Sequence, residues 1–133
     1  MIKNVTVIPF INKSVKEEAD RLYNILLQTD FLLLPTRAEC AGIVFCEASA
    51  FGIPSITTDT GGVSTYVQNG INGFTLPISS GAEAYADKIL DLYSKEDAYR
   101  QLCISSRNKY DATLNWDAWG ASFRLVTETV LNK

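Results

Sequence analysis

The amino-acid sequence predicts an α/β domain in which about four parallel strands are flanked by helices and followed by a helical C-terminus. Short β-branched or apolar runs alternate with segments of helical periodicity across residues 5–80, a pattern typical of a parallel sheet with helical crossovers. The length of 133 residues fits one ordinary domain. We therefore expect a single domain that covers residues 1–133.

The first expected strand is 5–11, which is β-branched and apolar. Pro9 demotes its end to an edge position, because proline removes a donor from the hydrogen-bond ladder. Ser14 is a candidate cap for an amphipathic helix over 15–27, where apolar residues recur at helical spacing. The next strand, 31–34, is apolar on both faces, as expected of a strand covered by helices on either side.

A helix is expected over 42–51, and a strand over 55–58 after the Gly52-Ile53-Pro54 stop. A glycine turn over 59–62, one helical turn over 64–67 and a strand over 74–77 complete the sheet. Two helices are expected over 82–93 and 96–110.

The last helix carries an aromatic and apolar seam at spacings of three and four residues. Such a face requires a cover, so we expect it to lie in the core or to face another domain. Its residues are Trp116, Trp119, Phe123, Val126 and Val130.

Composition excludes several function classes. The chain has no histidine, which excludes a Ser-His-Asp or Cys-His site within it. The net charge is −3 and the basic residues are scattered, so nucleic acid is not an expected partner. The three cysteines match no zinc or haem spacing and are interpreted as reduced thiols. No apolar run suits a membrane span or a secretion signal, so we expect a cytoplasmic protein without membrane-surface contact.

The candidate site is the loop 35–41, between the end of the 31–34 strand and the helix that opens at Gly42. Ligands of open parallel sheets bind at this edge. The first N–H groups of the helix, from about Gly42, Ile43 and Val44, form an anion site together with the helix dipole. Glu39 precedes the helix and Glu47 lies inside it, an arrangement that suits a nucleotide-sugar with hexose, diphosphate and ribose in order.

The segment 31–77 resembles the donor-site segment of group 1 glycosyltransferases, the GT4 family with the GT-B fold. Its signature residues are Glu39 and Glu47 with seven residues between them, Gly42 three after the first, Gly52-Ile53-Pro54, and the Gly61-Gly62 turn. The resemblance implies a partial Rossmann-like domain, the C-terminal, nucleotide-sugar-binding half of a retaining glycosyltransferase of polysaccharide, glycolipid or small-glycoside synthesis.

The resemblance also implies roles for single residues. Glu39 matches the catalytic-site glutamate that contacts the donor sugar, and Glu47 matches the one that binds the ribose hydroxyls. Gly42, Ile43 and Val44 match positions whose amides contact sugar and diphosphate, and Gly61 and Gly62 belong to the same donor site. The leaving diphosphate of the family accepts the acceptor's proton, so no metal or other cofactor is expected.

Family members carry two earlier strands with an arginine and a lysine for the diphosphate, and before them an acceptor-binding domain. In the Rossmann strand order the strand 31–34 would therefore have an open apolar edge. We expect the chain to pair its 5–11 strand there, to form a homo-oligomer, or to dock on a separate acceptor domain. Without such a domain the chain is expected to be inactive.

Other interpretations remain open at this point. Glu39 and Glu47 are also explained as surface carboxylates near a helix N-terminus, and Arg37 as a solvated loop residue instead of a phosphate ligand. A non-catalytic nucleotide-sugar-binding module or a truncated relic is the alternative to a transferase half. An interaction domain without ligand is the third possibility.

Overall fold

The computed structural model describes residues 3–131. A parallel sheet in the order β1-β2-β3 forms its centre, made of β1 (Leu32–Leu34), β2 (Ser55–Thr58) and β3 (Gly73–Leu76). Every residue of β2 is buried, as expected of the central strand. The predicted α/β class and the parallel strand direction are confirmed.

Helices connect and cover the strands. They are α1 (Lys16–Leu26), α2 (Ile43–Ala50), α3 (Val63–Tyr66), α4 (Ala82–Tyr93), α5 (Glu96–Lys109), the π-helical segment η1 (Tyr110–Leu114) and α6 (Trp116–Leu131). These bounds agree with the predicted helices within a few residues. The only new element among the described residues is η1, which was expected to be the end of one helix and a loop.

The sheet separates two apolar clusters. Ile56, in register with Leu33 and Phe74, belongs to the cluster formed with α4 and α5. In the second cluster, Phe45 of α2 packs with Val63 and Val67. Leu32 and Leu34 of β1 pack against this cluster. β2 is buried on both faces, as its lack of polar-apolar alternation predicts, whereas Leu33 of the edge strand β1 is 47% exposed.

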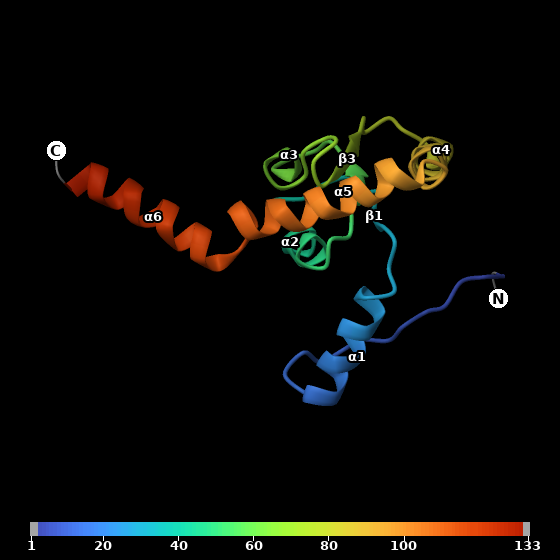
Figure 1. Ribbon diagram of the computed structural model, residues 1–133, viewed down its shortest axis with the longest axis horizontal. Helices are drawn as coiled ribbons and strands as arrows, with labels where there is room; N and C mark the ends of the chain where they lie inside the picture. Colours follow the sequence, from blue (N-terminus) through green and yellow to red (C-terminus); the bar gives the residue numbers. More distant parts are fainter. Residues whose placement is uncertain (1–2, 132–133) are drawn as a thin grey trace.

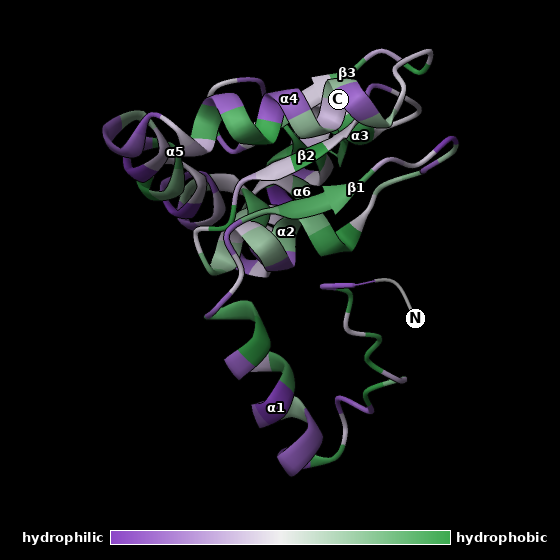
Figure 2. Cartoon of the chain, turned by 90° about the vertical axis from the view of Figure 1, so that its right-hand side faces the viewer, coloured by the Kyte–Doolittle hydropathy of each residue, from purple (hydrophilic) through white to green (hydrophobic). Residues whose placement is uncertain are grey.

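The predicted strand over 5–11 is wrong, since this segment has no strand structure and the sheet has three strands instead of about four. The segment and α1 lie apart from the sheet (Figure 2). Val7 and Phe10 are 86% and 90% exposed. β1 is an edge strand of this sheet, so the expected re-pairing of the segment beside β1 does not occur. Pro9 disfavours a strand here, because proline has no N–H group to donate to the hydrogen-bond ladder of a sheet.

The aromatic seam of α6 is not part of the core. α6 runs away from the sheet (Figure 1) and contains no buried residue. Trp116 packs edge-on against Trp119, and Trp119 stacks on Phe123, so the aromatic rings cover one another only partly. The first expected alternative, burial in the core, is therefore wrong within this chain, and the second, a face toward another domain, stays a prediction.

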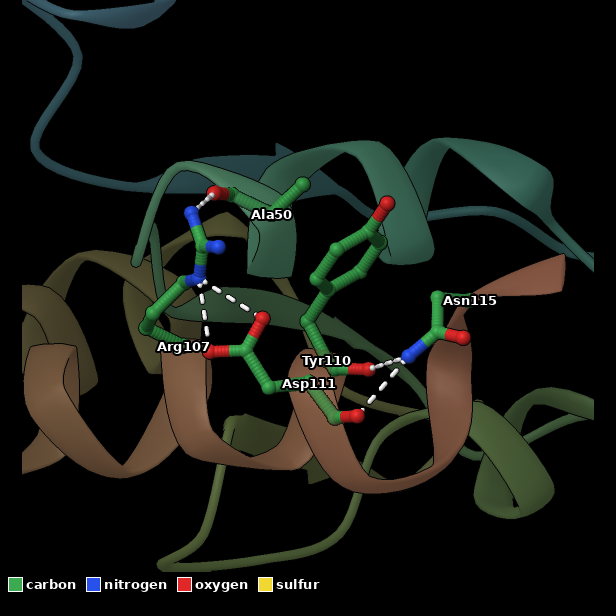
Figure 3. A network of polar contacts seen from close by, with 5 residues as sticks. All are labelled: Ala50, Arg107, Tyr110, Asp111 and Asn115. Carbon is green, nitrogen blue, oxygen red and sulfur yellow. Dashed lines mark hydrogen bonds and ion pairs between the residues drawn. The ribbon is translucent and has the colours of Figure 1, made fainter. Parts of the chain in front are cut away.

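A polar network fixes the point where α6 departs (Figure 3). The Nε–H group of Arg107 in α5 is shared between the two carboxylate oxygens of Asp111, at 3.1 and 3.0 Å. The Nη1 atom of Arg107 donates to the Ala50 carbonyl at 2.8 Å, which ties α5 to the end of α2. The Asn115 amide donates to the Tyr110 and Asp111 carbonyls, and its oxygen accepts the Ala118 N–H. Asn115 therefore caps both η1 and α6.

The turn after β2 lies against the loop after β1. A Cβ atom on Gly61 would lie 2.1 Å from the Glu39 carbonyl oxygen, and one on Gly62 would lie 2.2 Å from the Cys40 carbonyl oxygen. Gly61 also has a φ of 53°, which disfavours other residues. The glycine pair is therefore required for close backbone contact between the two loops.

We predict that Gly62→Ala lowers the free energy of unfolding by about 2 kcal/mol, because the new methyl group would displace the backbone at Cys40. The measurement is chemical denaturation followed by circular dichroism. The control is Gly81→Ala, which also precedes a helix but has open space around its Cβ position and should cost less than about 1 kcal/mol. Equal stability of the two variants would contradict the proposed close contact.

Candidate functional site

The loop between β1 and α2 ends at a glycine that the core requires. Gly42 has a φ of 58° and immediately precedes α2. A Cβ atom at this position would lie 2.4 Å from the ring of Phe45, which is fully buried. Gly42 is therefore explained by backbone conformation and by its contact with the core. The helix begins where it does because the chain can turn above the Phe45 ring.

Glu39 lies beside this turn, and its side chain folds back on it. Its Oε1 atom accepts the N–H groups of Gly42 and Ala41, at 3.1 and 3.4 Å. Oε2 has no hydrogen-bond partner within residues 3–131. The carboxylate is thus oriented by the backbone and retains one oxygen for another donor. The Gly42 amide, expected to be open for a ligand, is already used.

Two further amides at the start of α2 remain open. Phe45 donates to the Gly42 carbonyl, whereas the N–H groups of Ile43 and Val44 have no acceptor in the described part of the chain. The Ile43 side chain is 62% exposed, and the Val44 side chain packs against the cluster of Phe45. Unpaired N–H groups and the positive end of the helix dipole favour an anion here.

Glu47 lies one helical turn after Ile43, on the same face of α2. Both line a cavity with a volume of about 510 Å³, within the usual range for ligand sites. The remaining lining comes from the segment before α1, from α1, the loop before α2, α2 and α3, and from η1 and the start of α6: Lys13, Leu22, Tyr23, Leu26, Ala41, Cys46, Ala50, Phe51, Tyr66, Tyr110, Thr113, Leu114, Asn115, Trp116 and Trp119.

The two glutamates do not share this cavity. Glu39 is absent from its lining, whereas Glu47 contacts it directly. Glu39 is instead close to the glycine turn, because its carbonyl oxygen accepts the Gly62 N–H at 3.4 Å. The structure thus brings Glu39, Gly42, Gly61 and Gly62 together, and places Ile43 and Glu47 along α2.

Lys13 is the residue that sequence reasoning missed. Its Nζ atom forms an ion pair with Oε1 of Glu47, across 34 positions of the sequence. No local pattern pairs residues so far apart, so the sequence held no signal for this contact. Arg37, in contrast, is exposed and lines a different cavity of about 420 Å³ near β1 and α4.

The thiols near the site are free. All three cysteines are unpaired in the structure. Burial, and secondarily the negative charge of Glu47, raise the pKa of Cys46, so this thiol is a poor nucleophile at neutral pH. Within residues 3–131 no three potential acidic, thiol or imidazole ligands gather as in a metal site. No helix in this range is long and apolar enough to cross a membrane.

Comparison with known proteins places this geometry in a family. Sucrose-phosphate synthase from Thermosynechococcus elongatus shares the fold, with a TM-score of 0.71 over 89% of this chain, 29% of that protein and 24% sequence identity. N-acetyl-alpha-D-glucosaminyl L-malate synthase from Bacillus anthracis is 30% identical over 62% of this chain. Spore coat protein SA from Bacillus subtilis is 28% identical over 85% of it.

The chain spans only 22% and 29% of the lengths of these two curated relatives. The family model described as group 1 glycosyl transferases matches residues 2–109, which is most of the chain. The chain therefore belongs to the group 1 glycosyltransferase family.

Proposed function

We propose that the chain is the donor-binding half of a retaining glycosyltransferase that uses a nucleotide-diphospho-sugar. The observation that carries the proposal is the arrangement along α2. Open amides at Ile43 and Val44 precede Glu47 by one turn, and Ile43 and Glu47 line one cavity. A helical rise of 1.5 Å per residue separates positions 43 and 47 by about 6 Å, a spacing that suits a diphosphate followed by a ribose.

Each part of the donor then has a matching group. The diphosphate binds the N–H groups of Ile43 and Val44. The dipole of α2 replaces a metal ion as the source of positive potential. The ribose hydroxyls donate to Glu47, whose Oε2 has no partner among the described residues. The sugar contacts Glu39 through its open oxygen. Gly61 and Gly62 act indirectly, because their contact with the Glu39 loop fixes the position of that carboxylate.

The chemistry proposed for this site needs no base from the chain. The acceptor hydroxyl attacks the anomeric carbon on the face from which the diphosphate leaves, so the configuration is retained. The departing diphosphate takes the hydroxyl proton. The main task of the protein is therefore to stabilise the negative charge that develops on the leaving group, and preoriented N–H donors do this effectively. We propose no metal or other cofactor.

The relatives are named for different products. They include a D-inositol 3-phosphate glycosyltransferase and a glycogen synthase. These names describe those proteins. For this chain they support a sugar transfer.

The exposed apolar side chains support binding of this chain to a protein partner. The seam of α6 and the segment 5–11 place large hydrophobic side chains in solvent, among them Trp116, Trp119 and Phe10. Exposed apolar surface of this extent marks an interaction site. We propose that an acceptor-binding domain or a second copy of the chain covers it.

Glu47→Gln should weaken donor binding by about tenfold, because the neutral amide is a poorer acceptor for ribose hydroxyls. Calorimetry with UDP-glucose and GDP-mannose measures the effect, and Glu17→Gln, a change on the exposed side of α1, is the control. Equal affinity of Glu47→Gln and the parent protein would contradict the role of Glu47. Binding without transfer, even in the presence of an acceptor domain, would instead favour a non-catalytic nucleotide-sugar-binding module.

If a protein partner covers the exposed apolar surface, size-exclusion chromatography with light scattering should show the chain as an oligomer or in complex with an acceptor domain. Trp119→Lys should weaken that association, since it places a charge in the stacked seam, while Lys109→Met outside the seam should not. A stable, well-folded monomer that binds no acceptor domain would exclude the proposed cover.

A further inference from the structure

The ion pair between Lys13 and Glu47 differs from the other ion pairs of the described chain. The other four join residues four apart within a helix or at its end, namely Lys16–Asp20, Lys95–Asp91, Arg100–Glu96 and Arg107–Asp111. Lys13 and Glu47 instead join the segment before α1 to α2. Both side chains are partly exposed, at 57% and 39%, and such pairs contribute little to stability. Stability alone therefore does not account for the contact.

Among residues 3–131, these two side chains are also the only charged ones that line the cavity of about 510 Å³ beside α2. The rest of the lining is apolar, aromatic or uncharged polar. Lys13 is thus the single cation of the described residues that a ligand in this cavity can meet. Its ammonium group has three N–H donors, and the contact with Glu47 uses one of them.

A diphosphate beside Ile43 would lie about one helical turn from the carboxylate of Glu47, and like charges at that distance repel each other. A cation between the two anions removes this repulsion and adds a charge-assisted hydrogen bond. Lys13 already lies against Glu47, with two N–H donors unused. The segment before α1 thereby supplies a positive charge, which α2 itself does not contain.

We propose that Lys13 is a donor-binding residue whose ammonium group bridges the Glu47 carboxylate and the diphosphate of the nucleotide-sugar. This inference rests on the proposed function and adds a phosphate ligand to it. It also makes the segment before α1 part of the site, although α1 contains no buried residue. Donor binding would then hold α1 against α2, where at present Tyr23 contacts Phe51 at a ring distance of 6.0 Å.

The test compares the full chain with Lys13→Met and Lys13→Arg in calorimetry with UDP, GDP and the nucleosides uridine and guanosine. We expect Lys13→Met to weaken diphosphate binding about tenfold and to leave nucleoside binding unchanged, while Lys13→Arg retains most of the affinity. The matched control is Lys16→Met, which removes an exposed lysine three residues away and should leave both affinities unchanged.

Four outcomes would overturn the proposal. Equal loss for diphosphates and nucleosides would assign Lys13 a structural role at Glu47. Tighter diphosphate binding by Lys13→Met would show that the ion pair hinders diphosphate binding. Failure of the parent protein to bind any of the four compounds would defeat the proposed function together with this inference. Loss on Glu47→Gln without loss on Lys13→Met would defeat the inference alone.

Discussion

The turn that follows β2 lies directly against the loop that leads into α2, with no side chain between the two backbones. Gly61 and Gly62 make this approach feasible, because the space beside them is filled by the carbonyl groups of Glu39 and Cys40. The contact fixes the position of Glu39 relative to the sheet. It also fixes where the chain turns at Gly42, and hence where α2 begins. The glycine pair therefore has a structural role even before a ligand is considered.

Much of the fold follows from local sequence patterns. The runs at 31–34, 55–58 and 74–77 were expected as strands, and strands with almost these bounds are present. β1 is apolar at every position and β2 is rich in β-branched residues, and the helices between the strands have clear stops such as Gly52. The predictions that failed depend on distant partners. Segment 5–11 has strand composition, but a strand also needs a neighbour, and periodicity does not supply one.

The same reason explains the outcome at α6 and at the site. The spacing of Trp116, Trp119 and Phe123 identifies an apolar face without stating what covers it. At the site, the sequence places Glu39, Gly42 and Glu47 around the start of a helix, and the helix begins there. It could not indicate that the Glu39 carboxylate would occupy the Gly42 amide, or that Lys13 would reach Glu47. Both contacts depend on side-chain orientation in three dimensions.

The ring of Phe45 lies under Gly42 and belongs to the apolar cluster between the sheet and α2. One side chain thus serves as a core residue and as the floor of the turn that exposes the first amides of the helix. Any change in how that cluster packs is transmitted to the direction of those amides without passing through a ligand contact. If the proposed donor site is correct, a change in the packing of Phe45 would therefore alter the thermal stability and the affinity for the diphosphate together.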